Sequence, residues 1–528
     1  MLLFYTITQS YCIHQLSPNY DEGSFASYGI TILKFQGEKD IKKYDSKLPI
    51  TAVNMLPRAI EQVFNPGLIK ATTSDEDIMR GRYISLFISL LLALLIFKWA
   101  TELFGKATAT YCLALYLLCP NFLAHGIFVS SDIFACFFMT LTFYFLWKYH
   151  KEKKFKYFLY LSLATGLAQI SKFSMVHLFI LVPILSLVTI VSNPVNEKKI
   201  SFKKLLPLSF IFLFTSWFMI NAAHFFYQSF LPLGKYEFLS HSFNQLQHFF
   251  KGIYLPVPFP STYFSSMDMM LYSQQIGGGQ PGSLHGVPYI LAQSRVHGFW
   301  YYYFVVLFFK MPIPTLLILS ASITLLALQF RKKEFIRNEM FLIIPTVYFL
   351  VYLNFFYTTQ IGIRHIMIIF PLLFIFSGKL ISKMIEWKKQ YLLYALFAFQ
   401  AFSVLRFFPH FLPYTNEFIT DKKMAYKQIA DTNLCYGEGQ KFLWKYLSEN
   451  KNITLSPEYP VAGRVVIDVN DMLHVNPGTK GRYDWLRSLA PVDHIHSQYL
   501  VFDVKQSFID SLSKNQNNSH PFLPLSIL

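Results

Sequence analysis

Charged side chains are scarce in this sequence of 528 residues. Asp, Glu, Lys and Arg together make up 15%, against about 25% in an ordinary soluble domain. Apolar residues reach 53% and aromatic residues 18%, a composition typical of a membrane protein. The net charge is +17, but the basic residues lie in short clusters between apolar runs, as in cytoplasmic loops of membrane proteins. A nucleic-acid partner is therefore not indicated.

Cysteine is scarce too, and several familiar motifs are missing. The five cysteines form no CxxC pair and no regular framework, so we predict neither a disulfide scaffold nor a metal site built on them. Neither a Walker loop nor a dinucleotide fingerprint is present, and no internal repeat is visible. The start of the chain lacks a basic leader and an A-x-A site, so no cleavable signal peptide is expected.

Long apolar runs dominate what remains. Eight of them are long enough to cross a hydrocarbon layer of about 30 Å, near residues 83–103, 107–125, 129–147, 205–226, 304–329, 339–355, 364–382 and 391–408. Residues 157–191 hold two more, and residues 1–16 form either a short first span or one clipped at its start. The sequence therefore predicts a mainly α membrane protein with about eleven transmembrane helices.

Clusters of Lys and Arg predict the orientation of the chain. They lie at 148–157, 196–204, 331–337 and 379–389, which should be the cytoplasmic loops of a multi-pass plasma (inner) membrane protein. Three other segments then share the outer, periplasmic face. They are a first loop (17–81) with an interfacial helix, a second loop (227–300) expected to lack a core of its own, and a tail (409–528).

The tail differs in character from the rest. Its stretches "RVVIDVNDMLHV" and "HSQYLVFDV" read as strands, and "GQKFLWKYLSEN" reads as an amphipathic helix. We therefore predict a transmembrane domain over residues 1–408 and a small soluble α/β domain over residues 409–528.

Four residues on the predicted outer face could carry acid–base or sugar chemistry. Asp21 and Glu22 in "NYDEG" could provide a general base, or they could form a solvated turn. Asp132, at the start of an apolar run, could face a cavity or cap a helix. His125 could bond a sugar or phosphate, or it could fill space at the interface.

The enrichment of Lys and Arg in cytoplasmic loops does not explain the basic residues on the predicted outer face. Together they could form an anion pocket, for which Arg is especially suited, or each could reach back to the membrane interface on its own. These residues are Arg80, Arg82, Lys172, Lys310, Arg364 and His365.

Several stretches, in order, resemble one family. They are "YDEG", "GRYISLFISLLLALLIFKWATELFG", "CPNFLAHGIFVSSD", "GLAQISKFS", "FWYYYFVVLFFKMPIPTLL", "IGIRHIMIIFPLLFIFSGK" and, in the tail, "DTNLCYGEGQKFLWKYL" and "YDWLRSLAPVDHI". The chain is similar in these to bacterial-type members of the protein O-mannosyltransferase-like integral-membrane glycosyltransferases. The resemblance implies a C-type glycosyltransferase helical bundle with its active site at the outer leaflet.

The resemblance also implies a reaction. A sugar would move from a polyprenyl-phosphate-linked donor in the membrane lipid to a hydroxyl group of a protein, lipid or glycan acceptor, in a single inverting displacement. Asp21 would be the catalytic base, and Glu22 would help to hold acceptor or sugar. Asp132, with His125, would line the sugar pocket.

The same resemblance assigns the donor phosphate to basic side chains. Arg82 and Arg364 would bind it, with Lys172 and His365 as helpers. The donor is already activated, so no cytoplasmic nucleotide site is needed, and a divalent cation could bind if Asp21, Glu22 and Asp132 converge.

Two other classes of protein have to be weighed against an enzyme. A transporter or flippase of a lipid-linked sugar tends to show repeated halves and charges near the bilayer midplane, whereas here the candidate charges gather at one face. A catalytically inactive receptor or assembly subunit would keep the fold without needing the acidic pair.

Overall fold

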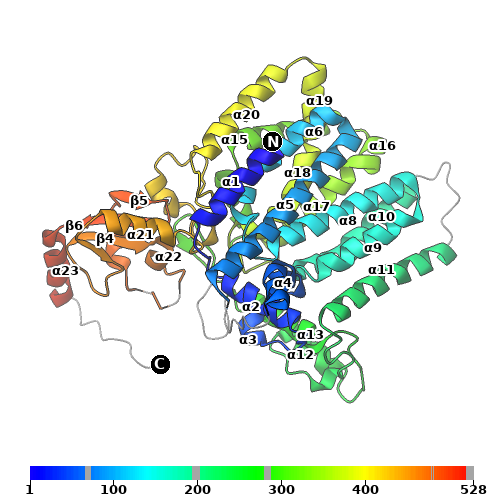
Figure 1. Cartoon of the computed structure of the whole chain (residues 1–528), viewed down its shortest axis with the longest axis horizontal. Helices are drawn as coiled ribbons and strands as arrows, with labels where there is room; N and C mark the ends of the chain where they lie inside the picture. Colours follow the sequence, from blue (N-terminus) through cyan, green and yellow to red (C-terminus); the bar gives the residue numbers. More distant parts are fainter. Residues whose placement is uncertain (66–72, 193–201, 279–286, 477, 480, 519–528) are drawn as a thin grey trace.

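A bundle of long helices with a small sheet beside it makes up the structure, a computed structural model (Figure 1). It describes residues 1–65, 73–192, 202–278, 287–476, 478–479 and 481–518. The bundle contains α1 (Leu2–Gln15), α5 (Asp75–Phe104), α6 (Lys106–Leu117), α7 (Pro120–His125), α8 (Asp132–Glu152), α9 (Phe155–Gln169), α10 (Leu178–Ser192), α11 (Phe202–Ala223), α14 (Tyr302–Lys310), α15 (Ile313–Leu328), α17 (Met340–Phe355), α18 (Phe370–Phe376), α19 (Gly378–Glu386) and α20 (Gln390–Leu405).

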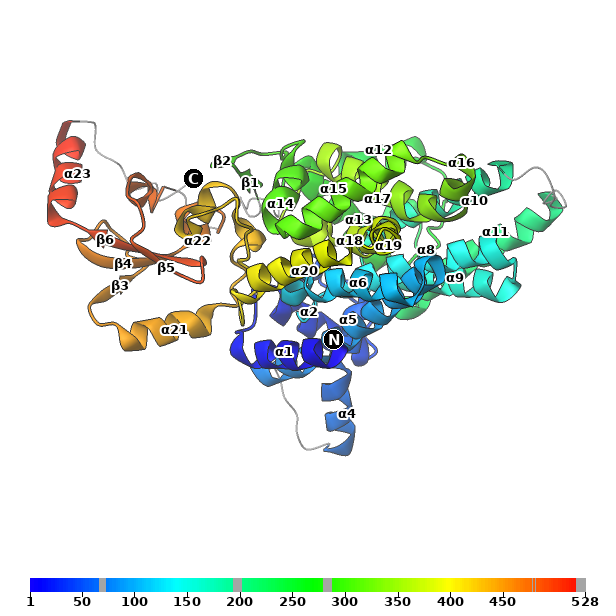
Figure 2. The same ribbon diagram turned by 90° about the horizontal axis from the view of Figure 1, so that it is seen from above.

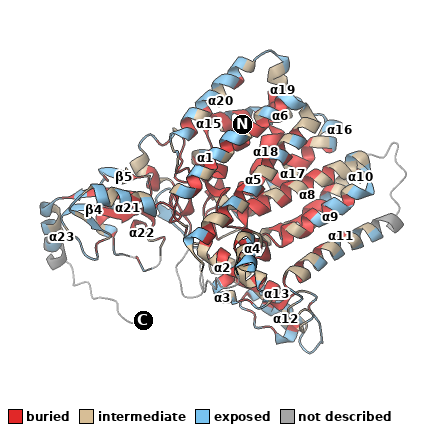
Figure 3. Cartoon of the chain, in the orientation of Figure 1, coloured by how far each residue is buried: buried red, intermediate tan, exposed pale blue. Residues whose placement is uncertain are grey.

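Five helical segments in the described chain are long and apolar enough to cross a membrane: Asp75–Phe104, Phe173–Ser192, Leu206–Ala223, Lys332–Phe355 and Met367–Glu386. Figure 3 shows buried residues through the middle of the bundle and exposed ones along α11. Many of these exposed side chains are large and apolar, as at Phe210 and Phe214, which fits contact with lipid tails rather than water. The predicted helical membrane protein is thereby confirmed.

Proline interrupts several of the predicted spans. The span 107–125 is two helices, α6 and α7, with Pro120 at the start of the second. The span 304–329 is likewise divided into α14 and α15, which Pro312 separates. Proline has no backbone N–H and disfavours a helical conformation in the residue before it. The long uninterrupted helices are for this reason fewer than the eleven spans that we predicted.

The start of the predicted span 364–382 is also irregular. Two short 3-10 turns, η5 (Ile363–His365) and η6 (Met367–Ile369), precede α18. Within a membrane, non-helical backbone is tolerated where it is buried in protein or lines a cavity. This irregular entry carries two of the predicted site residues.

The tail contains a sheet of four strands, in the order β3-β4-β6-β5. Strands β3 (Ile453–Leu455) and β4 (Gly463–Asp468) are parallel, whereas β6 (Tyr499–Val504) pairs antiparallel with both β4 and β5 (Asp493–Ile495). Helix α21 (Gln440–Glu449) packs on this sheet through Leu443. The predicted strands in "RVVID" and "YLVFDV" and the amphipathic helix are confirmed. The continuation of the first strand into "VNDM" is wrong, because these residues form helix α22 (Val469–Met472).

Residues 409–439 join the bundle to the sheet without a long helix. Their apolar side chains, among them Phe411, Tyr414, Ile429 and Leu434, are buried in the same hydrophobic cluster as the bundle helices. Lys310 Nζ fixes this segment, because it donates to the carbonyl groups of Leu412 at 2.5 Å and Asn433 at 2.8 Å. The first part of the tail is therefore packed into the helical part.

The first loop contains α2 (Glu22–Leu33), α3 (Ile41–Tyr44), the 3-10 helix η1 (Pro49–Met55) and α4 (Leu56–Phe64). Helix α4 projects from the molecule (Figure 2) and exposes Ile60, Val63 and Phe64. A helix is thus present where the sequence predicts one, and its place at a membrane interface stays a prediction.

The second loop contains α12 (His241–Phe249), α13 (Ser261–Gln275) and the hairpin β1 (Tyr289–Ile290) and β2 (Gln293–Ser294). The expectation that this loop has no core of its own is wrong. Tyr236, Phe238 and Phe243 pack around Phe264 with ring centroids 4.8 to 5.8 Å apart. Such aromatic pairs supply packing energy in a segment that is poor in aliphatic residues.

Candidate functional site

Asp21 lies where the first loop meets the tail. Its Oδ2 accepts a hydrogen bond from Arg364 Nη1 at 3.1 Å and another from the Tyr436 hydroxyl. Asn19 Oδ1 accepts the backbone N–H groups of both Asp21 and Glu22 at 3.0 Å. Asn19 therefore supplies the turn chemistry, and the Asp21 carboxylate is left to pair with the arginine.

Arg364 approaches Asp21 from η5. Its guanidinium lies over the Tyr436 ring, 4.8 Å from the centroid, and its Nη1 also donates to the Tyr436 hydroxyl. The Nε atom is buried and has no hydrogen-bond partner in the described residues. An unpaired guanidinium N–H is costly in isolation, and it is the kind of donor that a phosphate oxygen accepts from.

Glu22 and Arg82 form a separate, fully buried ion pair. Arg82 donates from Nε to Glu22 Oε1 at 2.8 Å and from Nη2 to Glu22 Oε2 at 2.6 Å. The side chain of Arg82 is 2% exposed and that of Glu22 is 0% exposed. The other three N–H groups of Arg82 bond to the carbonyl groups of Ile13, Leu16 and Ser17. All five N–H groups of the guanidinium are thus engaged within the chain.

This arrangement favours a structural role for both residues. Glu22 additionally accepts from the backbone N–H groups of Asn19 at 2.8 Å and Val129 at 2.9 Å. The pair therefore joins α1, α2, α5 and the turn before α8 behind Asp21. Phosphate binding by Arg82 and substrate binding by Glu22 stay predictions, and either would require these bonds to break.

Asp132 and Lys172 form a second ion pair near Arg364. Lys172 Nζ lies 2.6 Å from Asp132 Oδ1, at the first residue of α8. His125, His365 and Arg364 lie close enough for their charges to interact with Asp132. The structure thus gathers His125, Asp132, Lys172 and His365 around one cation, Arg364. The predicted phosphate-binding residue Arg82 lies instead in the separate pair with Glu22.

Two side chains of the tail belong to this group although we did not predict them. Tyr436 contacts both Asp21 and Arg364, and buried Asp431 lies close enough for its charge to interact with both. The loop that carries them is closely packed, because a Cβ at Gly437 (φ +90°) would lie 2.8 Å from the Tyr20 ring. That glycine is the signal in the sequence that marks the loop as part of a close contact.

The charges around Asp21 decide its protonation. Burial by itself would raise the pKa of Asp21, but the Arg364 and Lys47 cations and the hydrogen bond from Tyr436 hold that pKa below its ordinary value. Burial raises the pKa of the Tyr436 hydroxyl well above its ordinary value. The Arg364 cation acts to lower this pKa, and the Asp21 carboxylate acts to raise it. At neutral pH Asp21 is therefore ionised, and Tyr436 is protonated and donates to it.

Two of the basic residues that we predicted on the outer face hold the protein together instead of facing a ligand. Arg80 pairs with Glu61 at 2.6 Å and with Glu76 at 2.5 Å, which ties α4 to α5. Lys310 is buried and bound to backbone oxygens of the tail. The proposed anion pocket thus depends on Arg364 and, beside it, Lys172.

The carboxylates of Asp21, Glu22 and Asp132 do not converge. Each is paired with a different cation. No group of three or more His, Cys, Asp or Glu side chains able to hold a metal ion occurs in the described residues. The arrangement is that of an ion-paired site.

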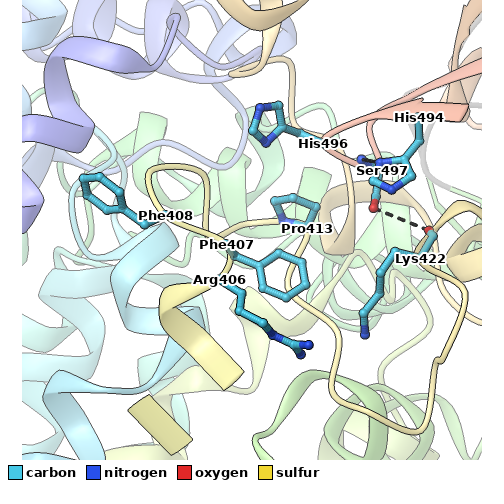
Figure 4. Close-up of a pocket in the computed structure, with 8 residues that line it drawn as sticks. All are labelled: Arg406, Phe407, Phe408, Pro413, Lys422, His494, His496 and Ser497. Atoms are coloured by element: carbon cyan, nitrogen blue, oxygen red, sulfur yellow. Dashed lines mark hydrogen bonds between the residues drawn. The ribbon is translucent and has the colours of Figure 1, made fainter. Parts of the chain in front are cut away.

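A cavity of about 250 Å³ lies elsewhere, between the end of α20 and the turn from β5 to β6 (Figure 4). Its charged residues are already paired: Arg406 donates to Glu417 at 2.8 Å, and Lys422 Nζ binds oxygens of Thr415 and Asn416. Its lining comprises Arg406, Phe407, Phe408, Pro413, Lys422, His494, His496 and Ser497, without any predicted site residue. We therefore place the functional site at Asp21.

Residues 71–220 match the model of the family described as dolichyl-phosphate-mannose-protein mannosyltransferase. This stretch holds Arg82, His125, Asp132 and Lys172, so the resemblance inferred from the sequence is confirmed there. None of the curated proteins matches the chain.

Solved structures of membrane glycosyltransferases resemble the chain at low identity. ArnT from Cupriavidus metallidurans bound to undecaprenyl phosphate is 15% identical with a TM-score of 0.48, over 80% of this chain and 67% of that one. An Archaeoglobus fulgidus oligosaccharyltransferase with Zn and sulfate is 15% identical with a TM-score of 0.45, over 77% and 51%. AglB from the same organism, with an inhibitory peptide and a dolichol-phosphate, is 14% identical with a TM-score of 0.47, over 76% and 54%. The chain thus spans about half the length of the two archaeal chains.

Proposed function

We propose that this protein is a membrane glycosyltransferase that moves a sugar from a polyprenyl-phosphate donor to an acceptor hydroxyl group. The observation that carries the proposal is the contact between the Asp21 carboxylate and Arg364, whose Nε still lacks a partner in the described chain. A proton acceptor and a phosphate-binding cation thereby meet at one place. The family match over residues 71–220 supports the same class of reaction.

The chemistry is a single displacement. Asp21 takes the proton of the acceptor hydroxyl, the hydroxyl oxygen attacks the anomeric carbon, and the bond from that carbon to the phosphate oxygen breaks on the opposite face. The configuration inverts, and the polyprenyl phosphate leaves with its electron pair. Arg364 stabilises the charge that grows on the phosphate, while Asp21 holds the proton.

Arg364 links donor binding to base strength. Before the donor binds, Arg364 contributes to holding the pKa of Asp21 below its ordinary value. A phosphate that draws the guanidinium away removes part of this effect, because the arginine then faces a second anion. The base therefore strengthens when the donor is in place.

The site would lie on the outer face of the plasma membrane. The clustered Lys and Arg of the predicted cytoplasmic loops support this side, although most of the 196–204 cluster lies outside the described residues. His365 and Lys172 would assist at the phosphate, and Asp132 with His125 at the sugar. The acceptor would be a protein, lipid or glycan of that face.

The test uses Asp21→Asn in the full-length protein. We expect transfer to fall by roughly 10²- to 10⁴-fold, the usual range for a general base, while undecaprenyl phosphate still binds. Mass analysis of surface glycans and glycoproteins, in a deletion strain complemented with wild type or variant, gives the readout and names the sugar and acceptor.

Asp493→Asn is the matched control, because Asp493 is exposed at the edge of the tail's sheet. It should restore the glycans as wild type does. Full restoration of the glycans by Asp21→Asn would contradict the proposed glycosyltransferase function. It would favour a flippase, which needs no proton acceptor at this position.

A further inference from the structure

We propose that Asp431 contacts the substrate and accepts a hydrogen bond from a hydroxyl group of the donor's sugar. This inference rests on the proposed function and assigns sugar recognition to the short 3-10 helix η8 (Asp431–Asn433) of the tail.

The Asp431 carboxylate has one oxygen without a partner. Its Oδ1 accepts the Thr432 backbone N–H at 2.7 Å, but Oδ2 is buried and bonds to nothing in the parts of the chain that the structure describes. The residue is 6% exposed. Buried polar atoms are nearly always paired, so such an oxygen calls for an explanation. A ligand hydroxyl group supplies the missing donor.

The backbone at Asp431 is held in an uncommon conformation. Its φ is +59°, which is unfavourable for an L-residue other than glycine, although Asp and Asn tolerate it best. Asn470 Oδ1 accepts the Asp431 N–H at 3.0 Å, and Leu434 and Cys435 donate to the Asp431 carbonyl. Strain that the surroundings maintain in this way is concentrated at functional sites.

The position of η8 relative to Arg364 indicates which hydroxyl group is meant. Thr432 donates to the Ile361 carbonyl at 3.2 Å, and Asn433 Oδ1 accepts the Ile363 N–H at 2.9 Å. Asp431 therefore lies beside the turn that carries Arg364. The charge of Arg364 acts on Asp431 more strongly than that of Asp21 does.

A carboxylate beside the turn that carries the phosphate-binding cation is placed for the donor. The sugar is bonded directly to the phosphate, whereas the acceptor hydroxyl must reach Asp21. Hydroxyl groups are good donors to a carboxylate, and the apolar carrier chain offers none. The sugar ring is thus the part of the donor that Asp431 can recognise.

The protonation of Asp431 makes this recognition sensitive to pH. Burial raises the pKa of Asp431 to about 6. The Arg364 cation acts to lower this pKa, and the Asp21 carboxylate makes a small contribution that raises it. Tyr302 and Tyr303 are the other titratable groups whose charges interact with it. At pH 8 Asp431 is an acceptor with both oxygens, and at pH 5 it carries a proton.

The test compares lipids with and without a sugar on full-length protein in nanodiscs. The probes are undecaprenyl phosphate and its mannose, glucose, galactose and N-acetylglucosamine derivatives. At pH 8 we expect wild type to bind at least one sugar form about tenfold more tightly than undecaprenyl phosphate, and Asp431→Asn to lose most of this preference. The affinity for undecaprenyl phosphate itself should not fall, because the substitution removes a negative charge beside the phosphate site.

Two variants and one condition keep the test decisive. Asn and Gly both accept φ near +60°, so Asp431→Asn and Asp431→Gly preserve the backbone, and Asp493→Asn is the control. Wild type alone should lose the preference between pH 8 and pH 5, which needs no substitution.

The outcomes separate this inference from the proposed function. Undecaprenyl phosphate that binds while both Asp431 variants keep the sugar preference overturns the role of Asp431 only. So does a wild type with no preference for any sugar form, or with an equal preference at pH 8 and pH 5. Failure of wild type to bind any of the polyprenyl phosphates overturns the proposed function, and the role of Asp431 with it.

Discussion

Asp21, Arg364 and Tyr436 form the centre of the site, although 415 residues separate the first from the last. The tyrosine hydroxyl touches the base and the cation at once. It stabilises the ionised form of the base, because it donates to the carboxylate. Tyr436 is therefore a positioning residue whose removal should alter the titration of Asp21.

Tyr436→Phe removes that hydroxyl and keeps the ring over Arg364. We expect the transfer rate to fall roughly tenfold, the effect of one hydrogen bond to a charged group. Loss of the bond raises the pKa of Asp21, and only the ionised base is active. The acid side of the pH–rate profile should therefore move to higher pH, as rates measured between pH 4 and pH 8 would show. Tyr483→Phe, a buried tyrosine of the tail, should leave the profile in place.

Asp431→Asn should stabilise the protein while it impairs sugar recognition. In the folded protein the pKa of Asp431 is about 6, above its ordinary value of 3.8. Ionisation of the Asp431 carboxylate thus lowers the free energy of unfolding. This loss is absent below pH 3.8, grows as the pH rises and is complete above pH 6. The amide removes this cost, up to about 3 kcal/mol at pH 8. Thermal unfolding followed by tryptophan fluorescence should show the gain at pH 8 and none at pH 4, and an equal gain at both would contradict the assignment.

The sequence allowed Asp21 and Arg364 to be predicted together, because charge is rare in this chain and both lie at ends of apolar runs. Tyr436 could not be predicted in the same way. It is one of 33 tyrosines, and its partners Arg364 and Asp21 lie 72 and 415 residues away in the sequence. Asp431 is distinguished by its backbone conformation and its unpaired oxygen, which only coordinates reveal.

At the scale of elements, the buried pair of Glu22 and Arg82 fixes the entry of α2 beside the bundle. Glu22→Gln leaves the Arg82 charge buried without its partner. We expect a loss of about 3 to 5 kcal/mol in stability, seen as a lower thermal unfolding midpoint. Glu61→Gln, which weakens the partly exposed contact with Arg80, should cost at most about 1 kcal/mol. Equal losses for the two variants would contradict the role of the buried pair.

Gly362 keeps the Arg364 turn against the tail. A Cβ there would lie 2.0 Å from Thr432 Oγ1, and the φ of +70° disfavours any other residue. Gly362→Ala should therefore push η5 and η8 apart and abolish most transfer, measured against the amount of folded protein. Gly234→Ala is the control, since nothing in the described chain lies within 4 Å of its Cβ position. Full transfer by Gly362→Ala would show that this contact is dispensable.

Helices were easier to predict than their interruptions. Apolar length identifies a span, but the same apolar letters continue through Pro120 and Pro312, where the backbone changes direction. The proline rule, applied at each of these positions, would have predicted the two breaks. The 3-10 turns around Arg364 have a similar marker, because Pro371 lies in the first turn of α18, which follows them.

At the scale of the whole molecule, the proposal requires one orientation in the membrane. All five cysteines are buried, so a membrane-impermeant maleimide should label wild type weakly. Lys34→Cys, exposed in the first loop, should be labelled on intact cells. Lys156→Cys, exposed within the first basic cluster (148–157), should be labelled only after permeabilisation. The opposite pattern would place Asp21 on the cytoplasmic side and contradict the proposal.

Composition was sufficient to predict a helical membrane protein, because no soluble core needs so many apolar residues with so few charges. The tail was predicted less completely. Alternating apolar residues identified two of its strands and its helix, but the packing of residues 409–439 into the bundle follows from long-range contacts such as those of Lys310. The local sequence of a segment does not predict which distant surface the segment will pack against.

The order in which the ribosome delivers these side chains has a consequence for the cell. Asp21 is synthesised before α5 and the bundle helices that follow it, and Asp431 and Tyr436 come only after these helices. A nascent or prematurely terminated chain can therefore hold the proposed base while it still lacks the partners that complete the centre. We expect such a truncated chain to transfer no sugar from the lipid pool.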